Sequence, residues 1–182
     1  MDAFEQLVAE TLWHDGYWAT TSVRVSLTRE DLAIIERPTS PAWELDVVAY
    51  SPGRNELLVV ECKSYLDSTG VTYAELKACE GRSRGRYKLF CEERLREVVL
   101  DRLLAQFAAR DTCAPDAKVQ LGLAVGKFKR GDEAAIRTLF AERHWMLIGP
   151  DWLRDKLKAL SADSYRNQTA SIVAKMLLRN SV

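Results

Sequence analysis

Two apolar runs lie close together in the first third of the chain, and a short polar segment separates them. The first reads Trp-Glu-Leu-Asp-Val-Val-Ala-Tyr over residues 43–50, and the second reads Glu-Leu-Leu-Val-Val-Glu-Cys-Lys over residues 56–63. Valine recurs in both runs, as is typical of strands, and the Ser-Pro-Gly-Arg-Asn segment between them has the composition of a turn. The pattern predicts a β-hairpin.

Hydrophobic spacing predicts the other elements. Apolar positions recur every three to four residues where we expect helices, and they alternate or run continuously where we expect strands. The expected helices cover residues 2–14, 28–35, 72–80, 92–110, 132–143, 149–160 and 164–179, and the further strands cover residues 17–26, 118–128 and 145–148. A helix joins the last two strands, so these should be parallel.

This order of elements predicts one α/β domain over residues 1–182. Helices should flank a mixed β-sheet, and a helical segment should end the chain. The sequence contains no internal repeat and no linker that would divide the domain.

Charge and composition narrow the class of protein. The 26 lysines and arginines balance the 26 aspartates and glutamates, whereas a protein that binds nucleic acid over its whole surface is usually basic. No apolar run approaches the length of a membrane span, and the amino-terminal segment is acidic where a signal peptide would be basic. We therefore expect a cytoplasmic protein with no membrane partner.

The four cysteines, at positions 62, 79, 91 and 113, lack the paired spacing of zinc ligands. In a cytosolic protein they are expected to be free thiols. The sequence therefore predicts neither a zinc site nor a disulfide.

Charged residues interrupt the apolar hairpin at three positions, Asp46, Glu61 and Lys63. Burying a charge is costly unless it pairs with another charge or binds a metal, so function is expected here. Glu61 and Lys63 are two residues apart on one strand and should project from the same sheet face, with Cys62 on the other.

The register of the hairpin decides whether Asp46 joins that face. If Tyr50 pairs with Leu57, Asp46 lies directly across from Glu61; a slip of one residue would turn Asp46 away. The apolar pattern does not choose between these registers because both strands are apolar on both faces. Only the chemistry of the charged residues favours the first.

Two carboxylates held close together form a hard-oxygen site for Mg²⁺ or Mn²⁺, which also takes waters and phosphate oxygens as ligands. A lysine beside them can orient or deprotonate the attacking water, or offset charge that develops on a phosphate. The residue types indicate metal-assisted hydrolysis of a phosphodiester bond.

Asp46 followed by Glu61-Cys62-Lys63 resembles the motif of the PD-(D/E)xK nuclease superfamily, which includes restriction endonucleases, archaeal-type Holliday-junction resolvases and Mrr-type enzymes. Leu45 stands where the family motif has proline. The resemblance implies a restriction-endonuclease-like fold and a Mg²⁺- or Mn²⁺-dependent DNA endonuclease. Asp46 and Glu61 would hold the metal together with the Cys62 carbonyl, and Lys63 would act on the water.

The resemblance extends to the first helix, where Phe4 and Glu5 match the helix that supplies an additional acidic residue in this family. Glu5 lies on the shoulder of the apolar stripe, whereas Glu10 lies further round toward solvent. Glu5 is therefore the expected fourth member of the site. A helix-start glutamate that only faces solvent is an equally good interpretation.

Two basic segments are candidates for contact with nucleic acid. Residues 81–88 form an expected loop that carries Arg82, Arg84, Arg86 and Lys88, and a second group, Lys127, Lys129 and Arg130, follows a strand. Tyr65, just after the hairpin, could stack on a nucleotide, although packing against the core is the simpler role. A solvated basic loop explains residues 81–88 equally well.

The sequence leaves three hypotheses. The first is a nuclease that acts on DNA, or on RNA, and that could work as a homodimer. The second is an inactive nuclease-like module that binds nucleic acid or a protein partner without cutting. The third treats Glu61 and Lys63 as an ordinary surface pair.

Overall fold

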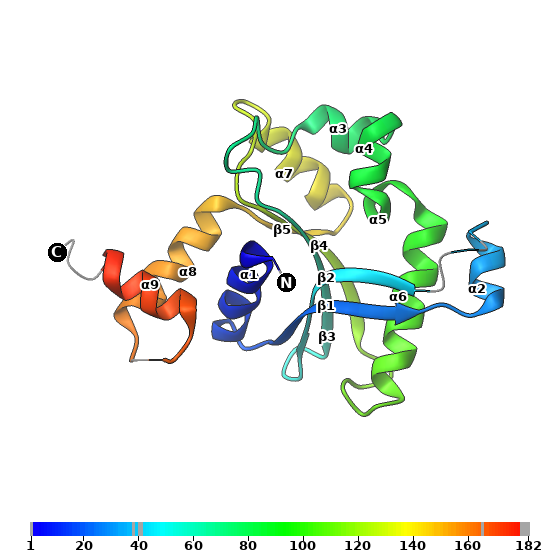
Figure 1. Ribbon diagram of the computed structural model, residues 1–182, viewed down its shortest axis with the longest axis horizontal. Coiled ribbons are helices and arrows are strands. Elements are labelled where there is room, and N and C mark those ends of the chain that lie inside the picture. The colour runs from blue at the N-terminus through cyan, green and yellow to red at the C-terminus, as the bar shows by residue number, and fades with distance from the viewer. Residues whose placement is uncertain (1, 38, 40–41, 165, 179–182) are drawn as a thin grey trace.

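A computed structural model describes residues 2–37, 39, 42–164 and 166–178, with the side chains of residues 82 and 83 excepted. Its centre is a five-stranded sheet in the order β1-β2-β3-β4-β5 (Figure 1). The strands are β1 (Trp18–Ser26), β2 (Ala42–Ser51), β3 (Glu56–Lys63), β4 (Lys118–Val125) and β5 (Met146–Ile148). β1, β2 and β3 are antiparallel neighbours, whereas β3, β4 and β5 are parallel. The expected mixed α/β sheet and the parallel final pair are confirmed.

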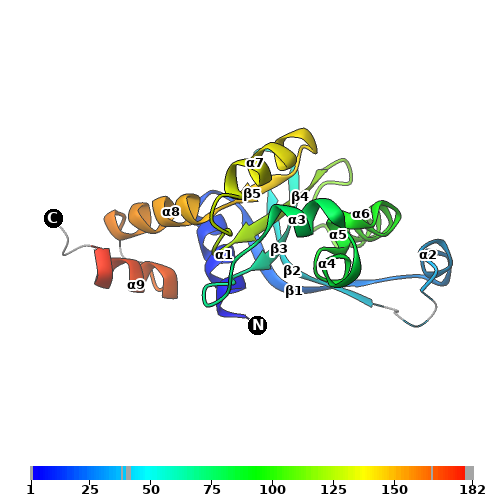
Figure 2. The ribbon, with the colours of Figure 1, turned by 90° about the horizontal axis from the view of Figure 1, so that it is seen from above.

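Helices pack around this sheet, and some of them extend the molecule beyond it at either end. They are α1 (Ala3–His14), α2 (Arg29–Ile34), α3 (Tyr73–Ala78), α4 (Gly81–Arg86), α5 (Lys88–Cys91), α6 (Glu93–Ala108), α7 (Glu133–Glu142), α8 (Pro150–Ala162) and α9 (Thr169–Leu178). Both views show α8 and α9 at one end of the molecule and α2 at the other, with α3 to α7 gathered between them (Figures 1 and 2). No helix in the described ranges has the length and apolar character that spanning a membrane requires.

The sheet separates two hydrophobic clusters. The larger one joins Val48, Leu57 and Val59 to α6 and α7, and the smaller one joins Val47 and Val60 to α1 and α8. Neighbouring residues of β2 and β3 thus enter opposite clusters, which is why both strands are apolar on both faces.

The hairpin forks before its strands end. Its ladder runs from Ser51 with Glu56 to Val47 with Val60, and there the pairing stops. Beyond that point β2 pairs only with β1, while β3 pairs with β4 as far as Lys63 and Val125. The sheet therefore divides into two wings, β1–β2 and β3–β4–β5.

The β1–β2 wing changes direction at the fork. Ser22 of β1, opposite Asp46, has φ +54°, a left-handed conformation that is unusual for a residue other than glycine. On one side of this position Ala19 and Val47 pack toward α1, and on the other Val23 and Leu45 pack into the larger cluster. The two faces of the β1–β2 ribbon therefore exchange sides at Asp46.

The structure corrects two expectations for residues 79–91. Residues 81–88 are not a loop, because α4 and the start of α5 occupy them. Cys79 and Cys91 are not free thiols, because they form a disulfide; of the cysteines, Cys62 and Cys113 remain reduced. The disulfide joins residues on either side of α4, so this helix lies in a covalently closed segment between α3 and the end of α5.

Candidate active site at the sheet fork

The fork brings the motif carboxylates together. Tyr50 pairs with Leu57, as the chemistry required, and the ladder ends at Val47 and Val60, one residue short of Asp46 and Glu61. The charge of Asp46 nevertheless acts on Glu61, so the two carboxylates are close. Backbone pairing has ended there, and the Cys62 N–H instead donates a hydrogen bond of 2.7 Å to Oδ2 of Asp46. The Asp46 side chain thus satisfies a strand amide that the partner strand no longer reaches.

Glu61 and Lys63 form an ion pair beside this carboxylate. Lys63 Nζ donates to Glu61 Oε1 at 2.7 Å, and the two side chains are only 17% and 21% exposed. Both project from the same face, as their spacing predicts. A pair so well shielded from water is screened less than a surface ion pair.

Burial and neighbouring charges shift the pKa values of Glu61 and Lys63. Burial raises the pKa of Glu61, Lys63 lowers it, and the nearby Asp46 raises it again, so the net pKa lies above its usual value. Burial lowers the pKa of Lys63, but Glu61, with smaller contributions from Asp46 and Tyr65, more than offsets this and the net pKa is raised. Lys63 is therefore an ammonium at neutral pH, a donor to water or phosphate and not a metal ligand.

Glu5 approaches the same place from α1. It is the third residue of that helix and completes a capping box with Asp2, which fixes the start of the helix. Burial raises the pKa of Glu5, and the charge of Asp46 raises it further. The Glu5 carboxylate thus lies near enough to Asp46 to feel its charge, but it accepts from the Asp2 N–H in the capping box, and its membership of the site stays a prediction.

Glu10 does not face solvent, contrary to expectation. Its side chain is buried, accepting 2.6 Å and 3.0 Å hydrogen bonds from the Ala170 N–H and Gln6 Nε2. The helical period placed Glu10 correctly on α1, but α9 covers that side of the helix. Glu10 holds the first turn of α9 and lies outside the fork.

The fork suits a cation that keeps part of its water shell. Within the described ranges no three His, Cys, Asp or Glu side chains are grouped closely enough to form a complete metal cage. Asp46 and Glu61 nevertheless offer the one or two carboxylates through which Mg²⁺ usually binds, with water and substrate phosphate as its other ligands. Burial raises the pKa of the Cys62 thiol far above its ordinary range, so the thiol stays protonated and only the backbone carbonyl suits such a cation.

The basic residues of positions 82–88 separate into two groups. Arg84 and Arg86 are exposed on α4 and pair with Glu92 at 3.3 Å and with Glu75 at 3.4 Å. Lys88 stands apart, with Nζ 5.4 Å from the centre of the Trp43 ring and close enough to Glu61 to lower the pKa of that carboxyl. The side chain of Arg82 lies outside the described part of the structure.

The second basic group is also divided. Lys127 Nζ donates to the carbonyl of Ser68 at 2.7 Å and to that of Leu66 at 3.4 Å, so it fastens the segment after β3. Lys129 and Arg130 are exposed at the surface that follows β4. Tyr65 packs partly buried against the larger cluster and has φ +44°.

Sequence reasoning missed how closely the end of β3 is held. The Gly126 N–H donates to the Lys63 carbonyl at 2.9 Å, and a Cβ on Gly126 would lie only 3.0 Å from the Ser64 carbonyl carbon. This is backbone against backbone, which only glycine allows. The glycine that follows the apolar run of β4 is the signal that could have revealed it.

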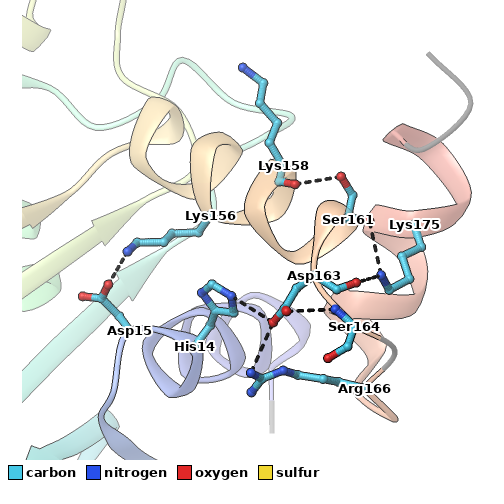
Figure 3. Close-up of polar contacts among 9 residues, drawn as sticks. All are labelled: His14, Asp15, Lys156, Lys158, Ser161, Asp163, Ser164, Arg166 and Lys175. Atoms are coloured by element: carbon cyan, nitrogen blue, oxygen red, sulfur yellow. Dashed lines mark hydrogen bonds and ion pairs between the residues drawn. The ribbon is translucent and has the colours of Figure 1, made fainter. Parts of the chain in front are cut away.

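A second polar cluster joins α1 to α8 and α9 (Figure 3). His14 Nε2 lies 3.6 Å from Asp163 Oδ2, Arg166 Nη2 lies 3.2 Å from the same oxygen, and Lys156 pairs with Asp15. These contacts tie the end of the first helix to the last two. His14 is thus a packing residue in this network and not part of the fork.

No protein-family model matches the chain, and searches of curated proteins and of solved structures find no match either.

Proposed function

We propose that the protein is a Mg²⁺- or Mn²⁺-dependent nuclease of the PD-(D/E)xK type that hydrolyses phosphodiester bonds in DNA. One observation carries the proposal: the sheet forks where Asp46 lies beside the partly buried Glu61–Lys63 pair. Charged groups kept in such a place cost folding free energy, and metal-assisted hydrolysis is a chemistry that uses all three.

Each residue has a separate role in this proposal. Asp46 and Glu61 would hold the cation, which when bound supplies Lewis-acid activation of the phosphate and of the attacking water. Lys63 would donate a hydrogen bond that orients that water or offsets charge on a phosphate oxygen, because its ammonium already lies in the fork. Glu5 adds negative charge near Asp46 and would strengthen the attraction of the fork for a cation.

DNA is the proposed partner, with RNA as the other nucleic acid to test and a homodimer as the assembly to test. Because the net charge is zero, attraction to a phosphate backbone must come from local cations. Lys88 lies next to the fork, while Arg84 and Arg86 provide exposed charge on α4. The cytoplasm is the proposed compartment.

A non-cutting module is the second candidate, and one observation favours it. Lys63 already satisfies Glu61, so the pair is stable without a cation. Such a module would bind nucleic acid or a protein through the same face with no dependence on metal.

Cleavage assays with matched variants separate these candidates. The purified protein is incubated with supercoiled, linear, single-stranded and branched DNA and with RNA, in Mg²⁺, Mn²⁺ or EDTA. The test variants are Asp46→Asn and Lys63→Met, and the controls are Asp155→Asn and Lys158→Met, which change an exposed ion pair on α8. We expect metal-dependent cleavage that both test variants lose and both controls keep.

The other outcomes are equally clear. Cleavage that survives in Asp46→Asn and Lys63→Met would refute the assignment of the site. Binding to DNA in EDTA, without cleavage in either metal, would support the non-cutting module instead. Calorimetric titration with Mn²⁺ gives a second readout, since wild type should bind the cation and Asp46→Asn should not.

A further inference from the structure

An open cavity of about 500 Å³ lies between α3, α5, the start of α6 and the end of α7. Both bridged cysteines, Cys79 and Cys91, line its wall, and both are partly exposed. None of the proposed catalytic residues borders this cavity. The disulfide is therefore open to a small molecule from solvent.

The residues that line the cavity carry a slight excess of positive charge. Lys77, Arg96 and Arg143 line it together with only two acids, Glu93 and Glu142, which leaves a formal charge of +1. Arg96 is committed to Glu93 and to backbone carbonyls. Cations near a sulfur favour the thiolate, which is both the attacking and the leaving form in thiol–disulfide exchange.

The other two cations are available to a ligand. Lys77 lies 5.5 Å from the centre of the Tyr73 ring and Arg143 lies 5.8 Å from that of Trp145. Within the described ranges neither has a carboxylate at ion-pair distance. An anionic group entering the cavity would complement both.

The disulfide also controls how firmly α4 is held. Of the α4 side chains that the structure describes, none is buried, and the helix contains two glycines, which are poor helix formers. Its described side-chain attachments are the exposed ion pairs of Arg84 and Arg86, which are weak. The bridge, with Cα atoms 5.3 Å apart, fixes the two ends of the segment.

We propose that Cys79–Cys91 is a thiol–disulfide exchange site that accepts a small carboxylate-bearing thiol through this cavity. The incoming thiolate attacks one sulfur, the S–S bond breaks, a mixed disulfide forms and the other cysteine leaves as a thiolate that takes up a proton. A second thiol displaces the first, giving two cysteine thiols and the oxidised small molecule. Two electrons pass from the two thiols to the protein, and α4 loses its covalent closure.

This assignment suits a reducing compartment, where disulfides are rare and are usually transient or redox-sensing. It does not depend on the nuclease proposal, because neither the cavity nor its chemistry involves the fork.

The test is the charge preference of the exchange. The oxidised protein is treated with 3-mercaptopropionate, 2-mercaptoethanol or cysteamine at low ionic strength, and each rate is divided by the rate of the same reagent with a neutral model disulfide, which cancels differences in thiolate fraction and intrinsic nucleophilicity. Alkylation and peptide mapping follow Cys79 and Cys91 separately from Cys62 and Cys113. We expect the anionic thiol to react about tenfold faster than the cationic one, as a single net charge near the reacting sulfur predicts.

Variants make the test specific. The double variant Lys77→Gln, Arg143→Gln should remove most of this preference, whereas Lys158→Gln, on the exposed face of α8, should keep it. Hydrogen exchange of residues 81–86 should become faster after reduction in the wild type. Equal rates for the three thiols, or a bridge that reacts only in denaturant, would overturn the proposal.

Discussion

The substitution Gly126→Ala tests whether the fork is held by backbone contact. An added methyl would lie 3.0 Å from the carbonyl carbon of Ser64, 3.1 Å from its Cα, and nearer still to its oxygen. All three are backbone atoms, so no rotamer change relieves the clash and the chain after Lys63 must retreat. The hydrogen bond from the Gly126 N–H to the Lys63 carbonyl, 2.9 Å long, would weaken or break.

The magnitude follows from these contacts. Overpacking costs about 1–3 kcal/mol, and a lost backbone hydrogen bond adds roughly 0.5–1.5 kcal/mol. In a chain of this size each 1 kcal/mol lowers the melting temperature by about 2–4 °C. In the proposed nuclease reaction, a displacement of Lys63 by roughly 1 Å should also reduce the cleavage rate about a hundredfold.

Thermal and urea unfolding measure the first effect, and single-turnover cleavage measures the second. Gly53→Ala is the control, because an added methyl in the hairpin turn meets no atom within 4 Å. We expect Gly53→Ala to match wild type in both assays. A Gly126→Ala protein as stable and as active as wild type would refute the idea that this contact positions Lys63.

Three further predictions concern charge and burial. Lys63 lowers the pKa of Glu61, so Lys63→Met should raise this pKa further above its usual value. In carboxyl ¹³C NMR, Glu61 should then stay protonated to a higher pH, and an unchanged midpoint would contradict the coupling. Glu10→Ala should leave the buried Ala170 N–H unsatisfied, at a cost of about 1–3 kcal/mol in stability. Hydrogen exchange should then be faster in α9 and unchanged in β3 and β4, and protection kept in α9 would count against this prediction. The Arg102 hydrogen bond lowers the pKa of Asp31, so this contribution to stability is present above the unfolded pKa of about 3.9 and is lost as pH falls through the lower folded value. Urea unfolding of wild type and Arg102→Met should therefore differ at pH 6 and converge in acid, and a constant difference would refute the linkage.

The hairpin was predictable because strand geometry leaves few choices. The period of two fixes which residues share a face, and the charges of Asp46, Glu61 and Lys63 select the register that their apolar neighbours leave open. The observed ladder has that register. The parallel pairing of β4 with β5 followed in the same way from the helix between them.

The missed features depend on segments distant in sequence. Composition made residues 81–88 look like a loop, because arginine and glycine carry no apolar pattern, and the Cys79–Cys91 bridge that closes this segment has no spacing signature. Glu10 seemed exposed because the segment that covers it begins at Thr169. The left-handed conformation of Ser22, where the β1–β2 ribbon changes direction, arises only where two wings of a sheet diverge, and no local sequence pattern encodes it.

The contact between Glu10 and Ala170 joins positions 160 residues apart. During synthesis α1 leaves the ribosome before α9, so the buried carboxylate of Glu10 has no backbone donor from α9 until the segment that separates them has been made. The helix that carries Glu5 is therefore made long before the contact that secures it. A nascent chain that stops before α9 would hold every residue of the fork but lack the contact that fastens α1 at its far side.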